Sequence, residues 1–270
     1  MKHSEPRCCF DASMCLGHPD AELCPRAVDV PRVVTELDRL QNGGHLSEAQ
    51  MLLEHWTDIA LRAGDWRGEL SLQSELMGLH RRTGDKKAAG AAVERGLELI
   101  RLHRLGGTVS GATIILNAAT TMKFLGKASD ALPLLRHASR IYAEQLDPSD
   151  YRFAGLYNNM ALVYQDTGDY ESAERHFRMA LDIIKSCGDP GNDTAVTLCN
   201  LAELYERMGR EQDIEPMLDR AYGCLTDPAL PRDGYNAFTL SKCIPTFDHF
   251  GYFIYVKALR ERMEEINERA

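Results

Sequence analysis

Apolar residues recur along this chain with the spacing of packed α-helices, most clearly in residues 157–180. In the first half of this stretch, four apolar residues fall at i, i+3, i+4 and i+7 and therefore share one helical face. They are Tyr157, Met160, Ala161 and Tyr164. Gly168 and Asp169 then end one helix and cap the next, which carries its own apolar stripe from Ala173 to Ile184. The stretch is predicted to be a helical hairpin with small residues where its two helices cross.

The same hairpin signal recurs along the chain with a nearly constant period. The glycines that end the first helix of each hairpin are Gly44, Gly84, Gly126, Gly168, Gly209 and Gly251. The intervals between them are 40, 42, 42, 41 and 42 residues. Five residues after each glycine stand the small or compact residues Ala49, Ala89, Ala131, Ala173, Ile214 and Val256. A period kept over this many units indicates a repeat protein, because glycines placed by chance would not keep a constant spacing.

This pattern resembles the tetratricopeptide repeat (TPR). Residues 157–180 follow its order of aromatic, Leu-Gly or Leu-Ala, Tyr, Gly-Asp-Tyr, Ala, aromatic and Ala at nearly every step. The period exceeds the roughly 34 residues of the usual repeat. In this it is similar to the longer repeats of kinesin light chains and of bacterial regulatory TPR proteins. The resemblance implies an all-α, right-handed solenoid of antiparallel helical hairpins, a TPR-like superhelix.

The chain divides into a tail and a repeat region. We expect residues 1–28 to be a Cys-rich disordered tail and residues 29–270 to form a single solenoid. Its units are predicted near 30–64, 65–105, 108–147, 150–188 and 191–227, followed by a degenerate C-terminal capping pair at 233–270. Pro245 lies inside the first helix of that pair and predicts a kink or break there. The charged end RERMEEINER is typical of a terminal cap that faces water.

Composition narrows the possible partners. With 270 residues, 44% hydrophobic and 26% charged, the chain has the figures of a globular protein. A net charge of −9 argues against a nucleic-acid-binding surface, which needs clustered Lys and Arg. The N-terminus lacks the apolar core of an export signal, and no run approaches the ~20 apolar residues needed to cross a bilayer. We expect a cytoplasmic protein with neither nucleic acid nor membrane as partner; the oligomeric state stays open.

The first 28 residues show no helical periodicity and hold four of the eight cysteines. Thiolates and imidazoles suit zinc, and the zinc candidates are Cys9, Cys15, His18 and Cys24. Their spacing lacks two close C-x2-C pairs, so it is not a recognised zinc finger. We therefore expect free thiols and no bound metal, and a zinc site or a redox-reactive cluster is the alternative.

The residues nine positions before each turn glycine suggest where a partner binds. They are Thr35, Glu75, Asn117, Asn159, Asn200 and Lys242. In TPR solenoids the first helices line the concave face, so the resemblance places the three successive asparagines in a groove. Because a carboxamide both donates and accepts hydrogen bonds, such a ladder can hold the backbone of an extended peptide. The alternative is that the asparagines bond to adjacent helices and fix the stacking of the repeats.

Helical spacing brings further polar residues to the same face. They are Thr113, Thr120, Lys123, Arg152, Asn158, Glu203 and Glu206, and Lys242 of the register itself is counted with them as a binding candidate. The groove is then expected to change from basic to acidic along its length, which could orient a partner. The predicted function is a non-catalytic protein- or peptide-binding scaffold without cofactors.

Two other classes of function compete with a binding scaffold. An enzyme is disfavoured because the chain has no phosphate-cradling glycine loop, no HExxH and no G-x-S-x-G. His80 takes the place of Tyr164 in its own unit and is expected to pack between helices. The runner-up is a peptide-sensing regulatory protein that acts on a partner through a change of solenoid curvature.

Overall fold

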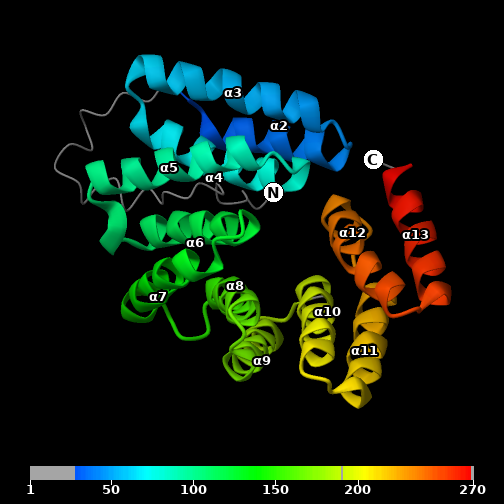
Figure 1. The fold of residues 1–270 in the computed structure, drawn as a ribbon. Helices are drawn as coiled ribbons and strands as arrows, with labels where there is room; N and C mark the ends of the chain where they lie inside the picture. The colour runs from blue at the N-terminus through cyan, green and yellow to red at the C-terminus, as the bar shows by residue number, and fades with distance from the viewer. Residues whose placement is uncertain (1–27, 190, 269–270) are drawn as a thin grey trace. The chain divides into compact units, whose positions relative to one another are not determined.

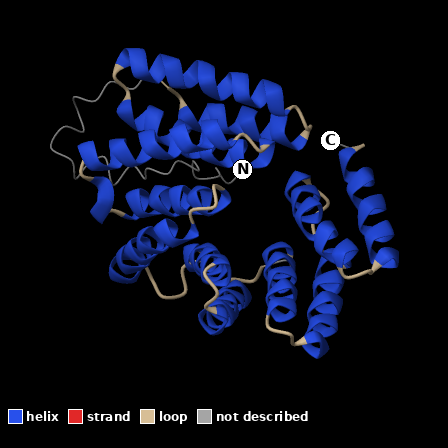
Figure 2. Cartoon of the chain, viewed as in Figure 1, coloured by secondary structure: helices blue, strands red, loops and turns tan. Residues whose placement is uncertain are grey.

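The computed structural model describes residues 28–189 and 191–268, and over this part of the chain it contains helices and turns but no strand (Figure 2). Consecutive helices pair as antiparallel hairpins joined by short turns (Figure 1). The all-α prediction is therefore confirmed. The zinc candidates Cys9, Cys15, His18 and Cys24 lie outside the described residues.

The chain forms two compact units, one ending at Gln145 and the other beginning at Leu146. The helices of the N-terminal unit are α2 (Val30–Asn42), α3 (Leu46–Ala63), α4 (Trp66–Thr83), α5 (Lys86–Leu102), α6 (Val109–Phe124) and α7 (Ala128–Gln145), with a 3-10 turn η1 (Leu105–Gly107). Those of the C-terminal unit are α8 (Arg152–Asp166), α9 (Tyr170–Ser186), α10 (Asn192–Arg207), α11 (Ile214–Thr226), α12 (Gly234–His249) and α13 (Phe253–Asn267), with η2 (Glu211–Asp213).

Left-handed glycines make the turns inside the hairpins, as the sequence predicts. Their φ values are 75° at Gly44, 79° at Gly84, 78° at Gly126, 83° at Gly168, 68° at Gly209 and 80° at Gly251. A side chain is disfavoured in this region of the backbone map, which explains why glycine recurs here. Aspartates follow two of these glycines and cap the next helix: Asp85 accepts from the Ala88 N–H at 2.9 Å and Asp169 from the Ser172 N–H at 3.1 Å.

Small residues let the two helices of each hairpin approach closely. The four alanines that stand five residues after the turn glycines, Ala49, Ala89, Ala131 and Ala173, are completely buried. Ile214 and Val256 fill the same position in the last two hairpins and are also buried. The crossing points predicted from the repeat period are therefore confirmed.

The sequence predicts a kink or a break at Pro245, and the break is wrong, because α12 runs as one continuous helix from Gly234 to His249. The kink stays a prediction. A proline inside a helix removes one backbone hydrogen bond, here the bond to the Ser241 carbonyl. Ser241 and Pro245 both lie on the exposed side of α12, where water can satisfy that carbonyl. Among the helices of residues 28–189 and 191–268, none is long and apolar enough to cross a lipid bilayer.

Candidate partner-binding surface

Within each unit, the first helices of successive hairpins lie next to one another. In the N-terminal unit these are α2, α4 and α6, and in the C-terminal unit they are α8, α10 and α12. We call the exposed side of these helices the first-helix face of the unit. It carries the residues that the sequence singled out as a partner-binding surface.

The three asparagines are half-buried, and their side-chain N–H groups bond within the protein. Asn117 Nδ2 donates to Ser74 Oγ on α4 at 2.8 Å, and Asn200 Nδ2 donates to Asn158 Oδ1 on α8 at 3.1 Å. Both bonds join the first helices of successive hairpins. They support the alternative reading that asparagines fix the stacking of the repeats.

Asn159 behaves differently, since its Nδ2 donates to the Gly155 carbonyl of its own helix at 2.8 Å. The sequence explains the difference. The acceptors of Asn117 and Asn200 stand ten residues before a turn glycine, at Ser74 and Asn158. The same position in the third hairpin is Leu116, whose side chain has no hydrogen-bond acceptor.

Most of the other candidates have partners of their own. Thr113 Oγ1 lies 2.7 Å from the Tyr142 hydroxyl on α7, so it faces its own hairpin. Thr120 Oγ1 donates to the Leu116 carbonyl at 2.9 Å. Lys123 is half-buried in the last turn of α6. These threonines therefore contribute little to an open surface.

The candidates of the C-terminal unit show the same behaviour. Arg152 binds the Asp150 carboxylate, and Lys242 Nζ lies 4.2 Å from the centre of the Phe238 ring. Glu203 accepts a 2.7 Å hydrogen bond from Thr246 Oγ1 of the next first helix. Glu203 thus carries a charge at the surface and also links two successive repeats through its hydrogen bond.

Further links cross the first-helix face of the C-terminal unit, and the sequence analysis missed them. Asp193 accepts hydrogen bonds from the hydroxyls of Tyr151 on one side and Tyr235 on the other, the second at 2.6 Å. Burial and the hydrogen bond to Asp193 raise the pKa of Tyr235. Glu206 pairs with His249 at 2.9 Å. Tyr151, Asp193 and Tyr235 are spaced 42 residues apart, so a search for polar residues at the repeat period could have found them.

The N-terminal unit has a different charge arrangement. Arg81 Nη1 donates to Thr121 Oγ1 at 2.6 Å and to the Asn117 carbonyl at 3.4 Å, which ties α4 to α6. Burial lowers the pKa of Arg81. Burial and the nearby Asp38 carboxylate raise the pKa of Glu75, which stands at the register of the asparagines. The Glu75 carboxylate on this face therefore has too little favourable charge and solvation around it to offset the cost of its ionisation.

Three described histidines are packed between helices or lie next to backbone carbonyls. His80 is buried, as predicted for a histidine packed between helices, and its Nδ1 has no hydrogen-bond partner. His137 Nε2 lies 2.6 Å from the Gly106 carbonyl, and His176 Nδ1 lies 2.7 Å from the Ser172 carbonyl. Over residues 28–189 and 191–268, His, Cys, Asp and Glu nowhere gather in a group of three that could hold a metal ion.

Residues 152–227 match the family model of the tetratricopeptide repeat. This segment carries tetratricopeptide repeats. The matched segment contains the two hairpins α8–α9 and α10–α11, including the stretch whose pattern is clearest in the sequence. No curated protein sequence matches the chain.

Solved structures share the TPR solenoid fold. BtubC (BKLC) from P. vanneervenii is 18% identical, with a TM-score of 0.53 over 90% of this chain and 92% of that one. A putative kinesin light chain from Podosopora anserina with nearly identical TPR-like repeats is 16% identical, with a TM-score of 0.50 over 73% of this chain and 94% of that one. At such identities the likeness establishes the all-α solenoid fold and nothing about the partners.

Proposed function

We propose that this TPR protein is a non-catalytic scaffold that binds an extended segment of a partner protein on its first-helix faces. TPR solenoids in general mediate protein–protein interactions, and the chain has this fold.

The orientation of the asparagine amides carries the proposal. Asn117, Asn159 and Asn200 each use Nδ2 for a bond within the protein, which fixes the plane of the amide. Among the described residues, none donates a hydrogen bond to their Oδ1 atoms. A fixed acceptor can receive a peptide N–H without losing further side-chain freedom, so binding is less costly than at a mobile amide. The asparagines would therefore serve as backbone acceptors as well as links between repeats.

Charge favours a partner segment that contains Lys or Arg opposite the C-terminal unit. Asp193, Glu203 and Glu206 bring carboxylates to the first-helix face there. Each accepts one or more hydrogen bonds from the protein, but a carboxylate has room for several donors. Complementary charge would steer and orient the partner rather than supply most of the affinity.

Peptides selected on the immobilised protein from a phage-displayed random library provide the probe. Their affinity would be measured by fluorescence anisotropy against wild type and Asn159→Ala. This variant is the cleanest, because it removes no bond between helices. We expect about fivefold weaker binding, which corresponds to the loss of one hydrogen bond of ~1 kcal/mol.

Asn42→Ala is the matched control, since Asn42 is exposed at the end of α2 and off the asparagine register. It should bind as wild type does. If Asn159→Ala and the triple variant Asn117→Ala/Asn159→Ala/Asn200→Ala bind the selected peptides unchanged, the asparagines only fix repeat stacking. If selection yields no peptide, the scaffold proposal in its peptide-binding form is wrong.

A further inference from the structure

The second helix of the last hairpin breaks the pattern of the five before it. The ninth residue after each turn glycine is Leu53, Val93, Leu135, Phe177, Leu218 and Arg260 in succession. The first five side chains are buried, and Arg260 is exposed. One turn further on, Tyr222 of α11 stacks on Tyr255 of the next hairpin at 3.8 Å, and the same position in α13 is Glu264. In α11 the following hairpin covers this side of the helix. The equivalent side of α13 is therefore charged.

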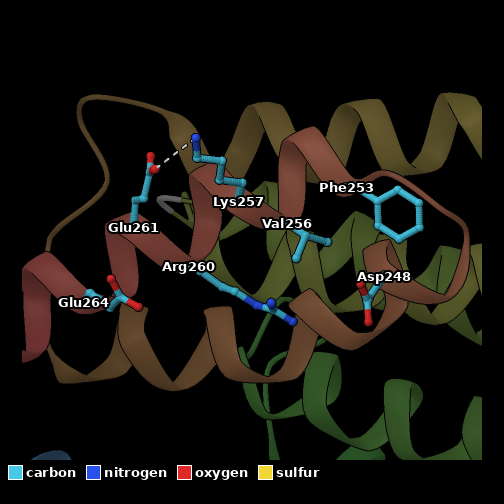
Figure 3. Close-up of a pocket in the computed structure, with 7 residues that line it drawn as sticks. All are labelled: Asp248, Phe253, Val256, Lys257, Arg260, Glu261 and Glu264. Carbon is cyan, nitrogen blue, oxygen red and sulfur yellow. Dashed lines mark ion pairs between the residues drawn. The ribbon is translucent and has the colours of Figure 1, made fainter.

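A shallow pocket of about 310 Å³ marks this side of α13 (Figure 3). One stripe of the helix lines it, from Phe253 to Glu264, together with Asp248 at the end of α12. Lys257 and Glu261 form a loose, exposed ion pair at 3.9 Å. Arg260 and Glu264 make no side-chain hydrogen bond or ion pair with the described residues. The stripe thus combines both charge signs, and two of its four charged side chains, Arg260 and Glu264, have no partner among the described residues.

The order of the charges along the stripe is significant. Lys257 and Arg260 come first, and Glu261 and Glu264 follow, all within two turns. Two such helices packed antiparallel about a two-fold axis between positions 260 and 261 would place Lys257 of one copy opposite Glu264 of the other. The same operation places Arg260 opposite Glu261. A parallel arrangement in the same register would oppose like charges instead.

We propose that this stripe of α13 is an interface with a second copy of the chain, in which the two α13 helices pack antiparallel. A two-fold interface uses the same patch on both copies, so each of the two ion pairs occurs twice. Apolar area comes from the start of the helix, where Phe253 is 67% exposed. In this arrangement Phe253 lies beside the last turn of the second α13 helix and loses contact with water.

The interface is expected to be weak and dependent on salt. A 15-residue helix is only about 22 Å long at 1.5 Å per residue, which limits the area that can be buried. Its charges lie on the surface, where ions in solution screen them. Dimerisation should therefore be visible only at high protein concentration and should weaken as ionic strength rises.

Charge reversal tests the pairing directly. Lys257→Glu/Arg260→Glu makes the stripe wholly acidic, and Glu261→Lys/Glu264→Lys makes it wholly basic. Sedimentation velocity from micromolar to millimolar concentration should show dimers of wild type. Each variant alone should associate roughly 100-fold more weakly or not at all, because like charges then face each other. An equimolar mixture of the two variants should form a heterodimer, since every opposed pair is again of opposite sign.

A matched control reverses two exposed basic residues elsewhere. Arg175→Glu/Lys185→Glu on α9 changes the net charge as much as Lys257→Glu/Arg260→Glu does, and it should dimerise as wild type does. Wild type that stays monomeric over the whole concentration range overturns the proposal and leaves α13 as a solvated cap or as the docking site of a different protein. Wild-type dimers without a heterodimer in the variant mixture also overturn it, because the interface then lies elsewhere.

Discussion

One linker in each compact unit shows a different balance between close backbone packing and side-chain hydrogen bonds. In the N-terminal unit the linker after α5 packs its backbone against α6, and a Cβ added to Gly111 would lie only 2.0 Å from the Leu105 carbonyl oxygen. In the C-terminal unit the linker after α11 is held by a side chain, since Arg262 Nη2 donates to the Leu230 carbonyl at 3.2 Å. Arg262 Nε also donates to Asn236 Oδ1 at 3.1 Å.

The difference determines which kind of mutation each linker tolerates. The first depends on the absence of a side chain, so adding atoms should disrupt it. The second depends on a chain of buried polar groups, because Asn236 Nδ2 also donates to Asn192 Oδ1 at 3.0 Å. Removing one member leaves the others without partners in a buried environment. Side chains bond linker carbonyls in both units, with His137 Nε2 2.6 Å from the Gly106 carbonyl and Gln145 Nε2 donating to the Gly107 carbonyl at 2.7 Å in the first. The first linker depends in addition on the absence of a side chain at Gly111.

Gly111→Ala should have the largest effect on stability. The new Cβ would collide with backbone rather than with a flexible side chain, so the linker or α6 must move. We expect a loss of about 3 kcal/mol or more in the free energy of unfolding, at the upper end for overpacked sites. Urea denaturation followed by circular dichroism measures it.

Gly155→Ala is the control for that substitution. Gly155 lies within α8, and a Cβ there would meet nothing within 4 Å. Replacing a helical glycine by alanine should stabilise the protein by roughly 0.5–1 kcal/mol. Equal destabilisation by the two alanines would show that the steric account of the first linker is wrong.

Asn236→Ala should rank second. Asn236 is completely buried, and its removal leaves both Asn192 Oδ1 and Arg262 Nε without their partner. We expect a loss of about 2–3 kcal/mol, since buried groups that lose their hydrogen bonds carry a desolvation penalty. Asn267→Ala, at an exposed position near the end of α13, should change stability by less than about 0.5 kcal/mol. A variant Asn236→Ala as stable as that control would mean that the network does not hold the linker.

Local signals in the sequence predicted the hairpins well, and the contacts between hairpins poorly. A left-handed glycine such as Gly168 or a crossing residue such as Ala173 is required by its immediate neighbours, so spacing alone reveals it. Asn236 and Asn192 are 44 residues apart, and Asn117 and Ser74 are 43 apart, so these pairs are offset by one or two positions from the repeat period. Periodicity does not say which offset brings two side chains together.

The alignment of asparagines was visible in the sequence, but their bonding was not. Whether an asparagine reaches the preceding repeat depends on the residue that stands there, which is Ser74 for Asn117 and Asn158 for Asn200. The error at Pro245 has a related cause. Helix rules describe an isolated segment, whereas α12 is supported by packing against α10, α11 and α13.

Two glutamates should give the units opposite responses to pH. Burial alone would raise the pKa of Glu174, but hydrogen bonds from Arg178 and Tyr205 outweigh it and hold that pKa below its ordinary value. Glu174 therefore stabilises the protein above the pKa of the unfolded chain, and this contribution is lost as pH falls through the folded pKa. Glu75 has a raised pKa, so its ionisation destabilises the protein as pH rises from the unfolded towards the folded pKa.

Glu174→Gln should lower the free energy of unfolding near pH 7 by roughly 1–2 kcal/mol through weaker charge-assisted hydrogen bonds. Glu75→Gln should raise the free energy of unfolding near pH 7. Both differences should shrink as pH falls to about 3, where the carboxyl groups are protonated in the unfolded chain. Urea denaturation at several pH values measures both variants. Shifts of the same sign at neutral pH would contradict the charge contrast between the surroundings of Glu174 on α9 and those of Glu75 on α4.

Asn117→Ala and Asn159→Ala should show the smallest effects and should differ in sign. Asn117→Ala removes the bond to Ser74 and is expected to lose about 1 kcal/mol. A double-mutant cycle with Ser74→Ala should return a coupling energy of ~0.5–1.5 kcal/mol, since the two side chains are in direct contact. Asn159→Ala removes a bond within α8 and gains helix propensity, so it should stabilise the protein by up to about 0.7 kcal/mol. If Asn159→Ala instead costs as much as Asn117→Ala, Asn159 also links repeats, and its value as a test of partner binding is lost.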